Sequence, residues 1–122
     1  MGEDCFMNAT TLEKSEAQII KKMNEPIIKN FLDIIIMSEL RNGPLSGYDI
    51  ISYIHNKFQL LASSGTIYSV LYNLERNDLI EGVWDERKPT HKLAPKGTHN
   101  IDTLLKANPE IKSFVSSFLK VQ

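Results

Sequence analysis

The stretch SSGTIYSVLYNLERNDLIEGVW, from Ser63 to Trp84, decides the fold of this chain. Its first half carries apolar residues three and four positions apart, which is the spacing of one buried helix face. These residues are Ile67, Val70, Leu71 and Leu74. Ser63 or Ser64 is suited to cap this helix at its N-terminus. Because the segment from Leu79 to Trp84 has the composition of a strand, the stretch predicts a helix followed by a strand.

Two helices are predicted near the N-terminus. From Thr11 to Met23 the apolar residues share one stripe, which is typical of an amphipathic helix. Glu25 and Pro26 are suited to begin a second helix, because the missing N–H of proline is tolerated in a first turn. This second helix is apolar on more than one face, and the run from Asn42 to Pro44 stops it. We therefore expect the second helix to lie at the centre of a domain.

A third helix and a hairpin flank the central stretch. Ser46 and Asp49 have the spacing of a capping box, and the helix that they open has one apolar side. That side consists of Gly47, Ile51, Ile54 and Phe58. Downstream, a loop of sequence DERKP joins the first strand to a second strand from Thr90 to Leu93. The segments that start at Pro95 and at Asn108 are predicted to be helical.

The order of these elements is that of a winged helix-turn-helix, in a chain that is mainly α. In this fold the third core helix enters a major groove, and the hairpin, or wing, touches the flanking backbone or the minor groove. A chain of 122 residues has room for one such core. We expect a tail and amphipathic helix over residues 1–24, the winged-helix domain over 25–97, and dimerisation helices over 98–122.

Composition narrows the classes of function. The 14 Lys and Arg against 15 Asp and Glu give a net charge of −1, so a nucleic-acid role requires a local basic patch. Cys5 is the only cysteine, which excludes an intrachain disulfide and fits a reducing compartment, by default the cytoplasm. The most apolar run, FLDIIIM, is interrupted by Asp33 and is shorter than the roughly 20 residues that cross a bilayer. We expect a cytoplasmic protein without a membrane partner.

The helix that starts near Ser63 has a polar side opposite its apolar stripe. Short hydroxyls and free N–H groups in its first turn suit phosphate, and the amide and guanidinium further along suit base edges or phosphate. The residues predicted to contact double-stranded DNA from this helix are Ser63, Ser64, Gly65, Thr66, Tyr68, Ser69, Asn73 and Arg76. We expect the neighbouring Tyr72 to be a half-buried packing group and Trp84 to belong to the hairpin core.

The wing and the two ends of the chain complete this prediction. Arg87, Lys88 and Lys92 make the wing mildly basic, and so few cations would give weak DNA binding by one copy. Two copies are therefore expected, on DNA sites that are inverted repeats. The apolar faces at both ends have little core left to cover, so we assign them to a homodimer. These residues are Leu12, Ile19, Ile20, Met23, Ile111, Phe114, Val115 and Phe118.

No residue pattern indicates catalysis, a metal or a cofactor. His55, His91 and His99 form no short ligand spacing, so a metal sensor is not expected. No serine has a recognisable base partner, no glycine-rich loop follows a strand, and no acid pair stands out. We predict that the protein is not an enzyme and that it binds no metal and no cofactor.

Three segments together resemble a known family. The segments GPLSGYDI (Gly43–Ile50), SSGTIYSVLYNLERNDLIEG (Ser63–Gly82) and LAPKG (Leu93–Gly97) are similar, in order and spacing, to the signature of PadR-like winged-helix transcriptional regulators. The resemblance spans roughly residues 30–97. It implies a homodimeric, DNA-binding repressor whose recognition helix carries the turn Gly65–Tyr68, with Tyr68 near the DNA backbone. Such regulators often respond to small aromatic or hydrophobic compounds, so an effector of this kind is a further expected partner.

The chain departs from the family pattern at the wing. Thr90 and His91 stand where a pair of tyrosines is frequent, and Ala94 stands where threonine is frequent. Two alternatives to a DNA-binding repressor stay open. One is a winged-helix module for protein assembly, which the net charge of −1 favours. The other is a sensor of a ligand or metal whose DNA contact is secondary.

Overall fold

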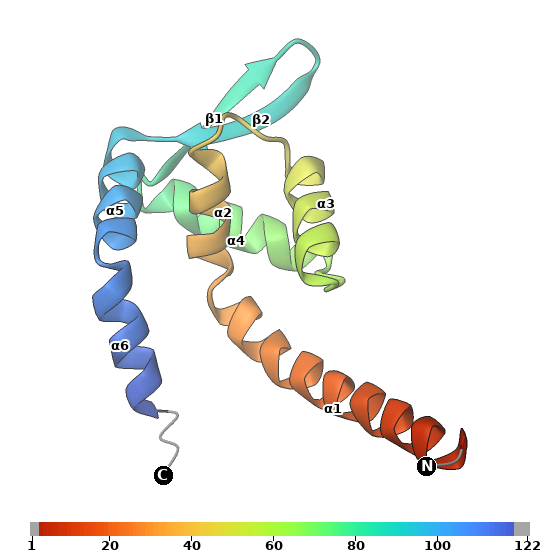
Figure 1. Cartoon of the computed structure of the whole chain (residues 1–122). Helices are drawn as coiled ribbons and strands as arrows, with labels where there is room; N and C mark the ends of the chain where they lie inside the picture. Colours follow the sequence, from red (N-terminus) through yellow and green to blue (C-terminus); the bar gives the residue numbers. More distant parts are fainter. Residues whose placement is uncertain (1–2, 119–122) are drawn as a thin grey trace. The chain divides into compact units, whose positions relative to one another are not determined.

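The computed structural model describes residues 3–118 and divides into two compact units, residues 1–32 and residues 33–122. Along the described part of the chain, helices precede and follow a hairpin (Figure 1). The elements are α1 (Glu3–Asn30), α2 (Leu32–Leu40), α3 (Gly47–Phe58), α4 (Ser64–Arg76), β1 (Ile80–Asp85), β2 (Lys88–Leu93), α5 (Pro95–Lys106) and α6 (Asn108–Phe118). This order confirms the predicted class, a mainly helical winged helix-turn-helix.

In the first unit the described residues form one long helix up to Asn30. α1 runs from Glu3 to Asn30 and passes through Pro26. The prediction that a new helix begins at Pro26 is therefore wrong. Proline removes only its own N–H from the ladder of helix hydrogen bonds, so the bonds on either side can continue. The break falls instead at Phe31, whose N–H is shared between the carbonyl oxygens of Ile27 and Ile28, both at 3.1 Å.

The second unit has a helical core formed by α2, α3 and α4. Ile36, Met37 and Leu40 of α2 are buried, as expected of a central helix. α3 begins at the predicted capping box. The N–H of Asp49 donates to Ser46 Oγ at 3.1 Å, and the N–H of Ser46 donates to Asp49 Oδ2 at 3.2 Å.

The buried side of α3 differs by one position from the prediction. Gly47, Ile50 and Ile54 are buried, whereas Ile51 and Phe58 are only half-buried. Gly47 and Ile54 belong to both sets, so the buried side is rotated from the predicted one by less than the step of about 100° that separates neighbouring residues of a helix. Positions 50 and 51 are both isoleucine, so the sequence is compatible with burial of either one, and tertiary packing buries Ile50.

α4 buries the stripe that its sequence predicts. Ile67, Leu71 and Leu74 are buried and Val70 is half-buried. Its N-cap is Ser63, whose Oγ accepts a hydrogen bond from the N–H of Thr66 at 3.1 Å. The stripe fixes the rotation of α4, and therefore determines which residues of this helix face outward.

The hairpin is longer and tighter than predicted. β1 and β2 pair antiparallel, and the turn between them consists of Glu86 and Arg87, with Glu86 at φ +55°. The predicted five-residue loop is wrong because β2 already includes Pro89, which pairs with Trp84. Each strand of a two-stranded sheet has a free edge, where the missing N–H of proline is tolerated.

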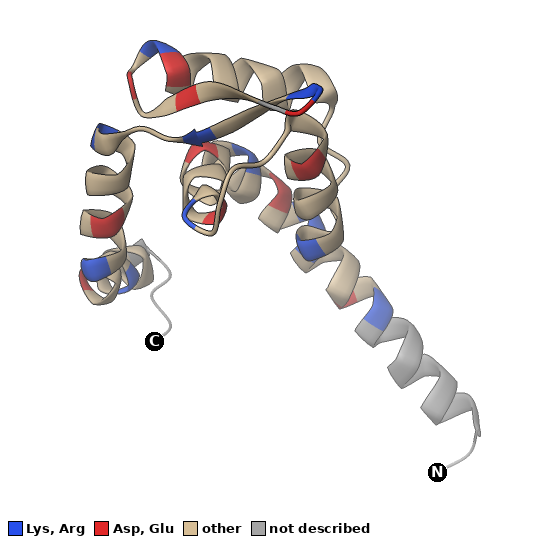
Figure 2. Ribbon diagram, turned by 90° about the horizontal axis from the view of Figure 1, so that it is seen from above, with Lys and Arg blue, Asp and Glu red and all other residues tan. Residues whose placement is uncertain are grey.

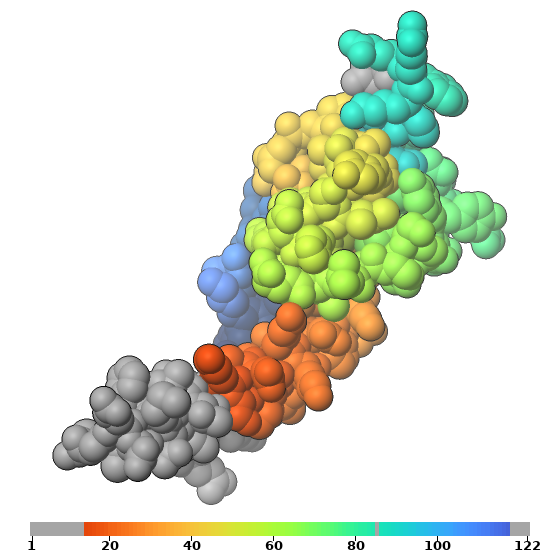
Figure 3. Space-filling view, turned by 90° about the vertical axis from the view of Figure 1, so that its right-hand side faces the viewer, coloured from red at the N-terminus to blue at the C-terminus, as the bar shows by residue number. Residues whose placement is uncertain are grey.

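Trp84 is not part of a core. Its side chain is 73% exposed, so the prediction that it lies in the hairpin core is wrong. The hairpin forms one end of this unit, beyond the yellow-green surface of α3 (Figure 3). Trp84 pairs with Pro89 near the turn, at the outer end of the hairpin, where none of the described helices covers it.

α5 begins directly after β2 and packs on the start of the hairpin. A Cβ placed on Gly97 would lie 1.9 Å from the carbonyl oxygen of Leu79, so only glycine fits this approach. The N–H of Ala94 donates to the same carbonyl at 3.0 Å, and Ala94 is an N-cap without a side-chain hydrogen bond. Arg41 Nε, beyond the end of α2, lies 2.9 Å from Asp102 Oδ1 of α5. These contacts fix α5 against the wing and α2.

Candidate nucleic-acid interface

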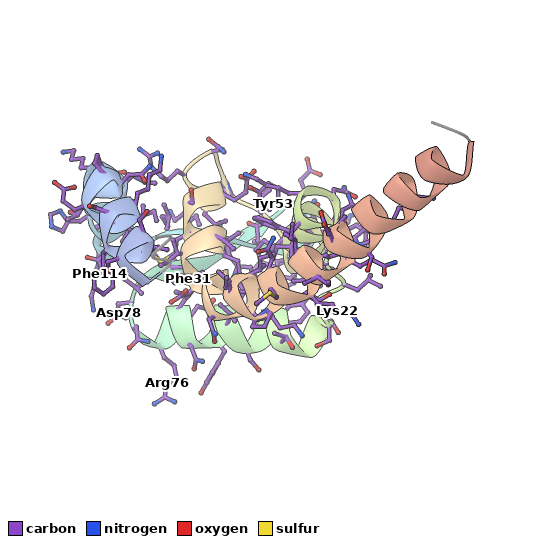
Figure 4. All side chains as sticks on the ribbon, turned by 60° about the horizontal axis from the view of Figure 1, so that its bottom comes forward. Lys22, Phe31, Tyr53, Arg76, Asp78 and Phe114 are labelled. Atoms are coloured by element: carbon purple, nitrogen blue, oxygen red, sulfur yellow. The ribbon has the colours of Figure 1, made fainter. Side chains whose placement is uncertain are left out.

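The outward face of α4 is open to solvent over its whole length. Tyr68 is 51% exposed, and every other residue that the sequence assigned to DNA contact on this helix is also exposed. Arg76, at the C-terminal end, extends from α4 away from the other elements of this unit (Figure 4). The face is therefore accessible to a large partner.

The first turn of α4 is polar and sterically open. Ser63 Oγ caps the N–H of Thr66 and also lies 2.8 Å from Thr66 Oγ1, so these two hydroxyls are oriented by each other. A Cβ placed on Gly65 would meet no atom within 4 Å. The backbone at Gly65 can thus be approached closely, and the free N–H groups of a helix N-terminus favour a phosphate there.

Tyr68 joins α4 to the start of α3. A Cβ placed on Gly47 would lie only 2.6 Å from Tyr68 Oη, so the tyrosine ring lies directly on this glycine. A hollow of about 260 Å³ opens beside this contact and is lined by Tyr48, Tyr68, Lys88 and other residues of α3 and β2. The phenol of Tyr68 is therefore at the meeting point of both helices and the wing.

Tyr72 does not pack in the domain. Its side chain is 60% exposed, which corrects the prediction of a packing group. Residues four positions apart share a helix face, so Tyr72 points the same way as Tyr68 and Arg76. The guanidinium carbon of Arg76 lies 5.8 Å from the centre of the Tyr72 ring, in the range of a cation–π contact.

Backbone and side-chain contacts attach the wing to the helices. Leu45, before α3, and His91, on β2, exchange two backbone hydrogen bonds of 2.8 and 3.0 Å. Lys88 Nζ lies 3.7 Å from Asp49 Oδ2 at the start of α3. His91 Nδ1 lies 3.5 Å from Glu75 Oε1 of α4, and this buried nitrogen has no hydrogen bond to any described residue. The position of the wing is thus linked to α3 and to α4.

Basic and acidic residues both occur on the ribbon of this unit, including the wing (Figure 2). Lys92 Nζ lies 4.0 Å from Glu81 Oε2, and Lys88 is next to Asp49. The hydrogen bonds from Ser46, first from its backbone N–H and then from its side chain, hold the pKa of Asp49 below its ordinary value, and Lys88 contributes further. Asp49 therefore remains a carboxylate at neutral pH and reduces the net positive charge at the base of the wing.

The end helices expose the apolar faces that the sequence assigned to dimerisation. In the first unit, Ile19, Ile20 and Met23 are exposed along α1. In the second unit, α6 exposes Phe114, at 65%, Val115, at 43%, and Ile111, at 37%. The side chains of Leu12 and Phe118, which were assigned to the same faces, lie outside the described residues.

Two features that the described residues lack bear on other classes of function. No group of three or more His, Cys, Asp and Glu side chains is arranged to hold a metal ion in the part of the chain that the structure describes. Among the described helices, none is both long enough and apolar enough to span a bilayer.

The sequence missed Tyr48 as a candidate for the interface. Its side chain is 74% exposed and lines the same hollow as Tyr68. One signal was available, because Tyr48 falls outside the apolar positions of α3 and therefore on its solvent side. Leu61, between α3 and α4, is 83% exposed and was missed as well.

The three-helix core, the hairpin and the open face of α4 define a winged helix-turn-helix protein. The model of the transcriptional regulator PadR-like family matches residues 36–102, more than half of the chain. The chain belongs to the PadR-like family of transcriptional regulators, which is a family of regulators and not of enzymes.

Solved structures of other transcriptional regulators are similar. One from Clostridium thermocellum is 26% identical, with a TM-score of 0.67 over 79% of this chain and 97% of that chain. Bacillus subtilis PadR in complex with operator DNA is 28% identical, with a TM-score of 0.53 over 61% of this chain and 46% of that one. The same regulator in complex with p-coumaric acid is 32% identical, with a TM-score of 0.53 over 63% of this chain and 42% of that one. Among curated proteins, none matches this chain.

Proposed function

We propose that this protein is a cytoplasmic, homodimeric repressor that binds inverted-repeat operator DNA with the outward face of α4. The observation that carries the proposal is the open first turn of α4, where Gly65 leaves the backbone accessible and Ser63, Ser64 and Thr66 present hydroxyls. The similarity to a regulator in complex with operator DNA supports it. Ser69, Asn73 and Arg76 continue the face along the groove.

The wing supplies the second contact of each copy. Arg87 lies at the turn of the hairpin, and Lys88 and Lys92 follow on β2. In winged-helix proteins this hairpin touches backbone or minor groove beside the recognition helix. A dimer with twofold symmetry would therefore bind two half-sites about one helical turn, or a multiple of it, apart.

The direct test is a titration of DNA from upstream of the protein's own gene, with a fluorescent label and unlabelled competitor DNA. Tight binding to one fragment that random DNA does not displace supports the proposal. Thr66→Ala and Ser69→Ala should each reduce operator affinity by about fivefold or more, because a contact to DNA is worth on the order of 1 kcal/mol. The matched control is Thr98→Ala, an exposed threonine in the first turn of α5. Absence of sequence preference in the wild type would refute the proposal.

The dimer can be tested separately, because the apolar faces of α1 and of α6 can each be disrupted by one substitution. Met23→Asp changes α1 and Val115→Asp changes α6, and both side chains are exposed. An aspartate in a dimer interface removes buried apolar surface and places an unpaired charge there. The variant whose substitution lies in the dimer interface should therefore sediment as a monomer. If the wild type is a monomer at micromolar concentration, dimeric operator binding is refuted.

A small aromatic or hydrophobic effector is proposed as a further partner, on the strength of the relative in complex with p-coumaric acid. Thermal unfolding with a panel of phenolic acids tests this, since a ligand that prefers the folded protein raises its melting temperature. An effector that also releases the protein from its operator would support a repressor.

A further inference from the structure

We propose that the protein holds the DNA backbone mainly through a row of tyrosine hydroxyls, and only to a small extent through cations. The row consists of Tyr48 on α3 and of Tyr68 and Tyr72 on α4. The inference rests on the proposed function and adds the chemistry by which the surface binds phosphate. Its direct consequence is an operator affinity that depends less steeply on salt than the number of cations beside this row would give.

The three tyrosines form a continuous row over the two helices. Tyr48 and Tyr68 line one hollow, and the ring of Tyr68 covers Gly47, the residue before Tyr48. Tyr72 lies one helical turn beyond Tyr68 on the same side of α4, and Arg76 follows after another turn. The row therefore borders the face that carries Thr66, Ser69 and Asn73.

The hydroxyls of this row are available to a ligand. Their side chains are 74%, 51% and 60% exposed for Tyr48, Tyr68 and Tyr72. None of the described residues forms a hydrogen bond with any of these three phenol oxygens. Tyr53 differs, because its hydroxyl accepts a hydrogen bond from Lys57 Nζ at 2.9 Å. A phenol has one O–H donor, and tyrosine is one of the side chains that donate to phosphate oxygens in DNA complexes.

Of the four cations beside the row, the two lysines lie next to carboxylates of the protein itself. Lys88 lies 3.7 Å from the carboxylate of Asp49, and Lys92 lies 4.0 Å from that of Glu81. A lysine that keeps a carboxylate beside it changes the local net charge little, so it releases few counterions from DNA. Arg76 and Arg87 have no carboxylate contact among the side chains that the structure describes.

The expected salt dependence follows from this count. The slope of log affinity against log salt is about −0.9 for each phosphate neutralised on duplex DNA. Two arginines from each copy of a dimer give a slope of about −4, whereas all four cations from each copy would give about −7. Hydrogen bonds from neutral phenols add affinity without adding to this slope.

The experiment measures fluorescence anisotropy of a labelled operator fragment from about 50 to about 300 mM salt. For the wild type we expect a slope near −4. Tyr48→Phe and Tyr72→Phe remove only a hydroxyl, and each should weaken binding at least fivefold at every salt concentration without changing the slope. Tyr53→Phe is the matched control and should bind as the wild type does. Arg76→Gln should make the slope shallower by about 2, because one cation is lost from each copy.

The outcomes separate this inference from the proposed function. A wild-type slope of −7 or steeper, or Phe variants that bind as tightly as the wild type, would overturn the inference and leave operator binding intact. A wild type that shows no sequence preference at any salt concentration overturns the proposed function itself. Circular dichroism of the Phe variants checks that each is folded, and Tyr68→Phe, which keeps the ring on Gly47, repeats the test at the helix junction.

Discussion

Gly65→Ala separates folding from DNA binding in this protein. Gly65 lies in the first turn of α4, and a Cβ at this position would meet no atom of the chain within 4 Å. Alanine is favoured over glycine in a helix by about 0.5 to 1 kcal/mol, so the variant should be more stable than the wild type by up to this amount. For a domain of this size that corresponds to a rise in melting temperature of about 2 to 5 °C.

The same methyl group should damage DNA binding. It extends about 1.5 Å from the backbone at the place where a phosphate or base edge would lie against α4. Displacing that contact should lower operator affinity at least tenfold, which corresponds to about 1.4 kcal/mol. Thermal unfolding and fluorescence anisotropy on the same samples measure both effects. Undiminished operator affinity would refute a close approach of DNA to Gly65, and a lower melting temperature would refute the open surroundings.

A second glycine supplies the control for this experiment. In Gly47→Ala the new Cβ would lie 2.6 Å from Tyr68 Oη and 2.7 Å from two ring carbons. The Tyr68 ring must therefore move, and the contact between α3 and α4 is disturbed. This variant should lose stability and operator affinity together, whereas Gly65→Ala should change them in opposite directions.

Four further substitutions test the packing and the caps, each by urea unfolding. Gly97→Ala places a Cβ 1.9 Å from a backbone oxygen and should cost about 3 kcal/mol or prevent folding, while an unchanged midpoint would contradict the packing of α5. Leu74→Ala, in the buried stripe of α4, should cost about 2 to 5 kcal/mol. Ala94→Ser provides the side-chain hydrogen bond that the N-cap of α5 lacks, and it should raise the free energy of unfolding by about 1 kcal/mol. A loss of stability would show that the hydroxyl cannot reach the N–H groups of the helix. The hydrogen bonds that lower the pKa of Asp49 stabilise the fold at a pH above the ordinary carboxyl range, and this contribution disappears as the pH falls through the lowered pKa. Between about pH 5 and about pH 2, the free energy of unfolding of the wild type should therefore fall more steeply than that of Asp49→Asn.

Local signals in the sequence were sufficient for the core of the fold. The capping box of Ser46 and Asp49, the cap at Ser63 and the stripe of α4 each depend on residues within one or two helical turns. Both partners of such an interaction are close together in the sequence, so the interaction can be predicted from a short segment. The rotation of α4 follows from its stripe, so the exposure of its polar side was predictable too.

Features that depend on distant parts of the chain were not predictable. Pro26 is compatible both with a helix start and with a helix interior, and only the structure shows which applies. Trp84 and Tyr72 have the composition of packing residues, but their burial depends on whether another element covers them, and none does within the described residues. The exposure of Tyr48 depends likewise on tertiary packing.

The most direct test of the account is an NMR titration of the labelled protein with its operator, in which the shift of every backbone amide is followed. We expect the largest changes at the start of α4, around Gly65 and Thr66, continuing to Asn73, with a second group at the wing near Arg87. Large changes confined to α5 and α6, with the amides of α4 unaffected, would contradict binding of DNA by this helix.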